Sequence, residues 1–176
     1  MRRLIRLIVA LTLVVGGAII LWDRFAPRPA PPVPVDTTQQ IDRIVIEKSA
    51  RRLIASRNGQ TVVTLPIALG FAPKGDKVKE GDGKTPEGTF AINRRNANSA
   101  YHLSLGLDYP RPADIARARN AGVDPGGDIF IHGQPNGLVG LSLPGDWTAG
   151  CIAVSNNEIK TLWQITPIGT VVEIRP

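Results

Sequence analysis

The sequence is poor in the residues that build disulfide-linked folds and metal sites. It holds one cysteine, Cys151, and two histidines among 176 residues. A single cysteine excludes a disulfide framework within one chain and a zinc site made of several thiolates. The thiol can still be a buried apolar side chain, a link between two chains or a reactive group. The aspartates lie among glycines without the spacing of a calcium-binding loop, so we expect no metal and no cofactor.

Aromatic residues are also scarce, at 5% of the chain, and the formal net charge of +6 is unevenly spread. Of the 21 basic and 15 acidic residues, five arginines and one aspartate lie in residues 1–35, which leaves the rest of the chain close to neutral. A nucleic-acid-binding domain needs a concentrated basic surface with aromatic platforms or a groove-reading motif. We therefore expect no nucleic-acid partner.

The first 25 residues have the pattern of a membrane anchor. Arg2, Arg3 and Arg6 precede an uncharged apolar run over Leu7–Trp22, which approaches the ~20 residues that a bilayer requires. The basic flank predicts a single-pass transmembrane helix over residues 1–25, with the rest of the chain on the outer side of the cytoplasmic membrane. A cleaved signal peptide is the alternative, although no A-x-A site follows the apolar run. Both interpretations export the rest of the chain.

A proline-rich segment follows the predicted anchor. Residues 26–35 contain five prolines, so we expect a linker over residues 26–40 in an extended polyproline conformation. At ~3.1 Å per residue, the proline-rich part would span roughly 30 Å. A single domain over residues 41–176 would then follow.

The opening of this domain predicts an antiparallel meander of three strands. The strands are expected at Ile41–Ile46, Arg52–Ser56 and Thr61–Leu65. Asn58-Gly59, between the second and third, is a two-residue hairpin signal.

The remainder of the domain predicts a long loop, further short strands and one or two short helices. The loop is expected at Gly70–Gly88, strands at Phe90–Ile92, Ile129–Ile131 and Thr170–Ile174, and helices at Asp114–Ala121 and Asn156–Ile165. The predicted fold class is therefore mostly β.

The residues that offer chemistry are Cys151 and His132. A cysteine nucleophile needs a nearby base, and the imidazole of His132 can accept the thiol proton and later return it to a leaving amine. The N–H groups of Gly150 and Cys151 can form an oxyanion hole, and Gly133 would keep the space beside the imidazole open while a backbone carbonyl holds its second nitrogen. From these residues alone, two structural roles explain them equally well: a histidine hydrogen-bonded at the end of a strand and a cysteine packed in the core.

The order Ile131-His132-Gly133, then Thr148-x-Gly150-Cys151-Ile152, resembles the YkuD-type L,D-transpeptidase catalytic domain. The resemblance extends over the whole domain and includes the long motif G-D-G-K-T-P-E-G-T at residues 81–89. It implies a β-rich sandwich or barrel, a peptidoglycan stem peptide as substrate and a thioester acyl-enzyme on the cysteine. By the resemblance, Cys151 is the nucleophile, His132 transfers the proton, Gly150 belongs to the oxyanion region and Thr148 takes the family's Ser/Thr position.

Two positions depart from the family pattern. Many members have a histidine where this chain has Ala149, and an arginine or asparagine where it has Ala153. The variant resembles a divergent subgroup with G-C-I-A, which favours amide cleavage as well as transfer. A transpeptidase is therefore the first hypothesis, a hydrolytic amidase or L,D-carboxypeptidase the second, and a non-catalytic wall-binding domain the third.

Three further residues are candidates for the substrate cleft. Tyr101, His102 and Trp147 could line it, and His102 fits a structural role equally well. The expected partners are peptidoglycan stem peptides and the membrane that holds the anchor, with the domain in the periplasm or on the cell-wall side. The sequence indicates no oligomeric state.

Overall fold

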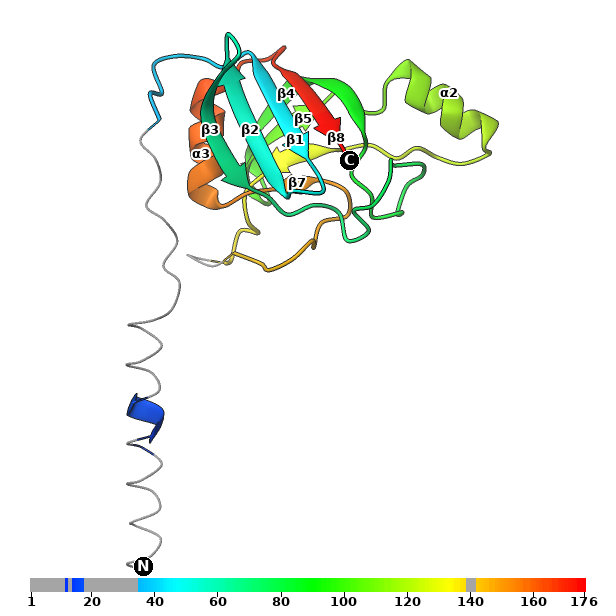
Figure 1. The fold of residues 1–176 in the computed structure, drawn as a ribbon. Helices are drawn as coiled ribbons and strands as arrows, with labels where there is room; N and C mark the ends of the chain where they lie inside the picture. The colour runs from blue at the N-terminus through cyan, green and yellow to red at the C-terminus, as the bar shows by residue number, and fades with distance from the viewer. Residues whose placement is uncertain (1–11, 13, 18–34, 139–141) are drawn as a thin grey trace, which may run out of the picture. The chain divides into compact units, whose positions relative to one another are not determined.

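The computed structural model describes residues 12, 14–17, 35–138 and 142–176, of which residues 35–176 form one compact unit (Figure 1). The described residues of this unit form eight strands and two helices. In chain order they are β1 (Arg43–Glu47), β2 (Arg52–Arg57), β3 (Gln60–Pro66), β4 (Gly88–Ser99), β5 (His102–Leu107), α2 (Pro112–Asn120), β6 (Phe130–His132), β7 (Ile152–Ala153), α3 (Asn156–Ile165) and β8 (Val171–Arg175).

Most of the predicted anchor and of the proline-rich linker lies outside the described residues. Within the described part of the chain, no helix has the length and apolar character needed to cross a bilayer. The anchor and the boundaries of the three predicted segments stay predictions.

The eight strands form one sheet in the order β3-β2-β1-β8-β4-β5-β6-β7. β1 pairs with β2 antiparallel and with β8 parallel, so a strand from the far end of the domain lies at its centre. β4 pairs with β8 through its first residues and with β5 through its later ones, and it thereby connects the two parts of the sheet. Two isolated bridges, Ala68 to Ala153 and Gly70 to Thr148, connect the segment after β3 with β7 and the loop before it. The first and last strands of this order are therefore linked to each other.

The core lies between the inner face of the sheet and helix α3. Alternate residues of the central strands are buried, as in the pairs Ile44 and Ile46 of β1 and Val172 and Ile174 of β8. α3 begins where Ser155 caps it, with the Ser155 hydroxyl accepting the N–H of Glu158. Its buried residues Ile159, Leu162 and Ile165 complete the core, whereas α2 projects from the side of the sheet in Figure 1.

The mostly β fold with few short helices agrees with the expectation from the sequence. The three-stranded meander is confirmed, and Asn58 and Gly59 both have positive φ, at 49° and 76°, as the hairpin signal requires. Helix α3 has the expected bounds, and α2 begins two residues earlier than expected, at Pro112.

One part of the secondary structure was predicted wrongly. The short strand expected at Phe90–Ile92 is the twelve-residue β4, and β5 was not expected at all. Residues 93–101 read N-R-R-N-A-N-S-A-Y, without apolar alternation, because most of this part of β4 is exposed. The resulting hairpin of β4 and β5 forms a wall of the candidate active site.

Candidate active site

Cys151 and His132 line the same cavity, of about 350 Å³. The hairpin of β4 and β5, strand β6 and the loop before β7 supply its walls. The lining residues are Asn96, Ser99, Ala100, Tyr101, Ser104, Asp128, Phe130, His132 and Cys151. A second hollow of about 480 Å³ lies beside α2, but neither a histidine nor the cysteine lines it. The first cavity is therefore the place where the chain can do nucleophilic chemistry.

His132 is held in one orientation at the end of β6. Its backbone pairs with Ser104 of β5 and Ala153 of β7, and its Nδ1 lies 2.7 Å from the carbonyl oxygen of Gly133. A carbonyl only accepts, so Nδ1 carries the proton and Nε2 is left with a free lone pair. Burial lowers the pKa of His132 below its ordinary value of 6.5, opposed by the hydrogen bond to Gly133. The ring is therefore neutral near pH 7 and has an unprotonated Nε2, which a general base requires.

An aromatic cluster surrounds the imidazole. The ring of Tyr101 lies 4.6 Å from that of His132, and the ring of Trp147 lies 5.7 Å from it at a steep angle. The indole Nε1 of Trp147 is buried without a hydrogen-bond partner. Tyr101 lines the cavity, whereas Trp147 does not line it and packs against the rings of Tyr101 and His132. Two of the three predicted cleft residues thus lie at the imidazole.

The Cys151 thiol lies in the cavity and donates a hydrogen bond to the carbonyl oxygen of Asp128, 3.3 Å away. Burial raises the pKa of this thiol above its ordinary value, and the carboxylate of Asp128 raises it further. The N–H of Phe130 and the cations of Lys77 and Arg94 lower it, but burial is the largest effect. The resting site therefore pairs a neutral thiol with a neutral imidazole.

The loop that carries Cys151 is braced by the side chain of Thr148. The buried Thr148 hydroxyl donates to the carbonyl of Cys151 at 2.7 Å and accepts the N–H of Gly150 at 3.1 Å. In this conformation the Gly150 N–H is therefore already engaged and does not point to a free oxyanion. Thr148 itself acts within the loop, and it does not line the cavity.

Gly133 lies against the start of α3 and against His102. A Cβ at this position would meet Oδ1 of Asn156 at 2.6 Å and side-chain atoms of His102 and Ile159 at 3.1 Å. The absence of a side chain therefore admits the start of α3, where Asn156 accepts the N–H of Gln134.

His102 is not brought to the cavity. It adopts a positive φ of 69° at the turn between β4 and β5, and its backbone N–H donates to the side chain of Asn136. Its Nε2 is buried without a partner. Among the described residues, no group of three histidine, cysteine or acidic side chains could hold a metal ion.

Two acidic residues at the site were missed in the sequence. Asp128 has a positive φ of 53°, and its carbonyl receives the thiol hydrogen bond. Asp146 accepts the N–H of Leu69 at 2.9 Å and forms an ion pair with Arg51, so it fixes the start of the cysteine loop. The only signal for Asp146 in the sequence was its position next to Trp147. Asp128 acts on the thiol through its backbone carbonyl, which no sequence pattern marks, and through the charge of its carboxylate.

A known family matches most of this domain. The model of the family described as the YkuD L,D-transpeptidase catalytic domain matches residues 41–174. No curated protein matches the chain.

Solved structures give the same result for the fold. The helical cell shape determining protein Pgp2 from Campylobacter jejuni is 28% identical with a TM-score of 0.61, over 78% of this chain and 48% of that one. Bd1075 from Bdellovibrio bacteriovorus is 27% identical with a TM-score of 0.56, over 78% and 49%. An L,D-transpeptidase from Xylanimonas cellulosilytica, 20% identical with a TM-score of 0.50 over 85% and 65%, shares the fold. The chain spans about half the length of the first two relatives.

Proposed function

The chain belongs to the YkuD family of L,D-transpeptidase catalytic domains, and we propose that it is a cysteine-dependent L,D-transpeptidase that acts on peptidoglycan stem peptides. The observation that carries the proposal is the shared cavity of Cys151 and His132, with the His132 Nδ1–H directed at the Gly133 carbonyl. This arrangement leaves Nε2 as the one ring atom that can take a proton from a group in the cavity.

In the proposed first step, the thiol sulfur attacks the carbonyl that follows an L-centre of the stem. As the S–C bond forms, Nε2 of His132 takes the thiol proton, and the carbonyl oxygen becomes an oxyanion. Collapse of this intermediate breaks the amide bond, and the imidazolium returns its proton to the leaving D-amino acid amine. A thioester on Cys151 remains.

In the second step, an acceptor amine attacks the thioester and gives its proton to Nε2, and the released thiolate is reprotonated by the imidazolium. The products are a new amide and the resting enzyme. Since thiol and imidazole are both neutral at rest, the proton moves during attack and not before it. The thiol must leave the Asp128 carbonyl to do so.

Hydrolysis of the same thioester is the alternative, and one observation favours it. Ala149 is exposed beside the nucleophile, where many family members carry a histidine, and its methyl group offers an acceptor amine no hydrogen bond. Water would then compete with the amine, and the enzyme would act as an L,D-carboxypeptidase or amidase.

We further propose that the domain works on the outer side of the cytoplasmic membrane, tethered by residues 1–25, and remodels the cell wall. The apolar run after three arginines supports the tether. The likeness to a helical cell shape determining protein supports a role in cell shape. Accessibility of the domain to added protease in spheroplasts, but not in intact inverted vesicles, tests this orientation.

The experiment for the activity incubates the purified full chain, in detergent, with muropeptides that carry tetrapeptide or tripeptide stems. Mass spectrometry follows the products, and intact-protein mass spectrometry follows the acyl-enzyme. Cys151→Ala is the matched control, because it removes one sulfur atom and leaves the backbone unchanged. A Cys151-dependent dimer or an exchanged terminal D-amino acid is the expected result.

Shortened stems without new linkages would show that the enzyme hydrolyses the thioester and does not transfer the acyl group to an amine. Unchanged turnover by the Cys151→Ala protein would refute the cysteine mechanism for both reactions. Binding of muropeptides without any covalent adduct or product would favour the non-catalytic wall-binding domain.

A further inference from the structure

The motif G-D-G-K-T-P-E-G at residues 81–88 lies directly against the cysteine loop. Gly150 has a φ of 140°, and a Cβ on it would meet the carbonyl oxygen of Lys84 at 2.7 Å. Gly70 lies between them, since its N–H donates to the Thr85 hydroxyl and its missing Cβ leaves room for the carbonyl of Gly83. The backbone of residues 83–85 is therefore the surface on which Gly150 rests.

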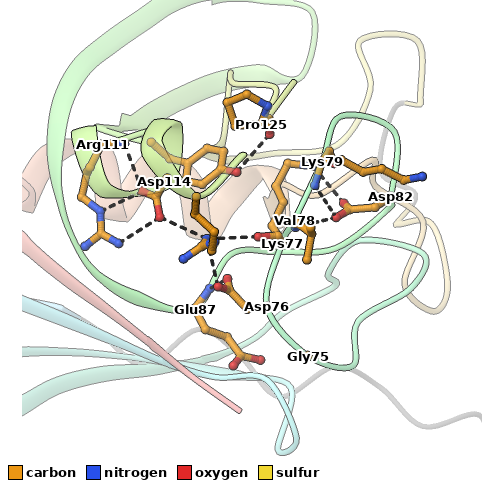
Figure 2. A network of polar contacts seen from close by, with 12 residues as sticks. Gly75, Asp76, Lys77, Val78, Lys79, Asp82, Glu87, Arg111, Asp114 and Pro125 are labelled. Atoms are coloured by element: carbon orange, nitrogen blue, oxygen red, sulfur yellow. Dashed lines mark hydrogen bonds and ion pairs between the residues drawn. The ribbon is translucent and has the colours of Figure 1, made fainter. Parts of the chain in front are cut away.

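Asp82 holds this backbone in place. Its carboxylate accepts the N–H groups of Val78, Lys79 and Lys84 at 2.8, 3.1 and 3.0 Å. It also accepts Nζ of Lys77 at 2.9 Å, and the side chains of both members of this ion pair are almost fully buried. Figure 2 shows Asp82 at the centre of the turn formed by residues 77–79. One carboxylate thus fixes both the turn and the residue whose carbonyl contacts Gly150.

The hydrogen bonds to Asp82 make its carboxyl group more acidic than an ordinary aspartate. Burial alone would raise the pKa of Asp82, but the hydrogen bonds from Val78, Lys77, Lys79 and Lys84 lower it to about 2. The carboxylate is therefore charged near neutral pH, and the turn does not loosen there by protonation.

We propose that Asp82, with its ion-pair partner Lys77, is a positioning residue for Cys151, acting through the Lys84 carbonyl on Gly150. The inference rests on the proposed function, because it concerns the same nucleophile. With the Lys84 carbonyl fixed, Gly150 keeps its left-handed conformation, and the next residue places its sulfur in the cavity that His132 lines. Without Asp82, residues 83–85 can move away and the cysteine loop follows them.

The charged groups that act on the thiol are Asp128, Lys77 and Arg94, and His132 lines the same cavity. Asp82 does not touch the thiol, but its ion-pair partner Lys77 acts on the thiol through charge. Lys77→Arg keeps that charge and therefore separates a movement of the loop from an effect of charge. A thiol released from its buried position takes on the ordinary acidity of a free cysteine, with a pKa of about 8.5. It then reacts faster with a small alkylating agent, although it is misplaced for catalysis.

The test compares Asp82→Asn with Asp114→Asn in the purified full chain. Asp114 is the matched control, because it is a buried aspartate that two arginines and a backbone N–H hold in the same polar region, but it braces α2 (Figure 2). For each protein, the rate of Cys151 alkylation by iodoacetamide is measured from pH 6 to pH 10, with urea unfolding as the measure of stability.

For Asp82→Asn we expect alkylation near pH 7 to rise several-fold and its midpoint to move down toward that of a free thiol. Turnover of a tetrapeptide stem should lose at least about tenfold in kcat, with KM changed less than threefold. Asp114→Asn should lose stability while its alkylation profile and kcat stay those of the native protein. If Asp82→Asn does not fold, Lys77→Arg, which keeps the charge, should give a smaller shift in the same direction.

A native alkylation profile in folded Asp82→Asn would overturn the proposal, and so would an equal shift in Asp114→Asn. The alkylation measurement needs no peptidoglycan substrate. If the native protein turns over no muropeptide, the proposed function fails while the positioning of the thiol is still decided.

Discussion

Replacing Thr148 by valine tests how the cysteine loop is held. Valine has nearly the shape of threonine, so the change deletes one hydroxyl and keeps the packing. That hydroxyl joins two backbone groups of the loop, the N–H of Gly150 and the carbonyl of Cys151, at 3.1 and 2.7 Å. The backbone of residue 148 stays anchored, because its N–H and carbonyl bond to Leu69 and Phe71. The perturbation is therefore confined to residues 149–151.

The cost follows from what the deletion leaves behind. Each buried polar group without a partner costs about 1–3 kcal/mol. Gly150 is buried, and Cys151 is partly buried. We therefore expect the two unpaired groups together to lower the free energy of unfolding by about 2–4 kcal/mol. The loop can recover part of this loss by moving, but movement displaces the sulfur. We therefore expect a fall in kcat of at least tenfold, with little change in KM.

Urea unfolding followed by circular dichroism measures the stability, and release of the terminal D-amino acid from a tetrapeptide stem measures turnover. Thr148→Ser is the control, because it keeps the hydroxyl and removes only a methyl group. A valine variant within about 0.5 kcal/mol of the native protein would refute the reasoning, since a surface change has that size. A serine variant as impaired as the valine variant would show that the methyl group, and not the hydroxyl, matters.

Three further predictions concern the same region. Gly150→Ala should abolish turnover and lower stability by about 1–3 kcal/mol, because its φ is unfavourable for alanine and its Cβ would meet the Lys84 carbonyl; a fully active variant in a muropeptide assay would contradict this. Burial lowers the pKa of His132 below 6.5, so the unfolded chain binds one more proton than the folded protein as pH falls below that value. The free energy of unfolding should therefore fall with pH in this range. His132→Gln should remove the contribution of this group to the pH dependence of the urea midpoint between pH 7.5 and 5. The Asp82 carboxylate, with a pKa of about 2 against 3.8, should contribute ~2 kcal/mol above pH 4. The stability difference between the native protein and Asp82→Asn should therefore vanish as pH falls from 4 to 2, and a constant difference would rule this origin out.

Local signals in the sequence were enough where one short segment decides the structure. The Asn58-Gly59 pair sets the hairpin of β2 and β3 because few other residues accept two successive positive φ angles. Helix α3 was predicted with its bounds because Ser155 and Glu158 form a capping box and apolar residues recur at helical spacing. Such features depend only on neighbours in the chain.

The β4–β5 hairpin could not be predicted in this way. The second half of β4 is polar and exposed, and it is a strand because its backbone pairs with β5 and not because its side chains are buried. The polar residues that hid the strand, Asn96 and Ser99, now line the cavity. The same polar residues thus line the candidate site and remove the apolar alternation that would have indicated a strand.

Cys151, His132 and Tyr101 could be named from the sequence and line one cavity, whereas the backbone contacts around them could not be named. The reach of the His132 ring to a backbone carbonyl was expected and is confirmed. The contact of the thiol with the Asp128 carbonyl and the support of Gly150 by the Lys84 carbonyl could not be foreseen. Carbonyl groups are present at every residue, so the sequence carries no mark of the few that matter.

The central position of β8 has a consequence for the time at which the domain can fold. β8 is synthesised after all the other elements, yet it is the strand that lies between β1 and β4. While the ribosome still holds residues 171–175, the meander and the cysteine-bearing half lack the strand that unites them, and their paired edges stay open. Completion of the sheet is therefore a late, long-range event.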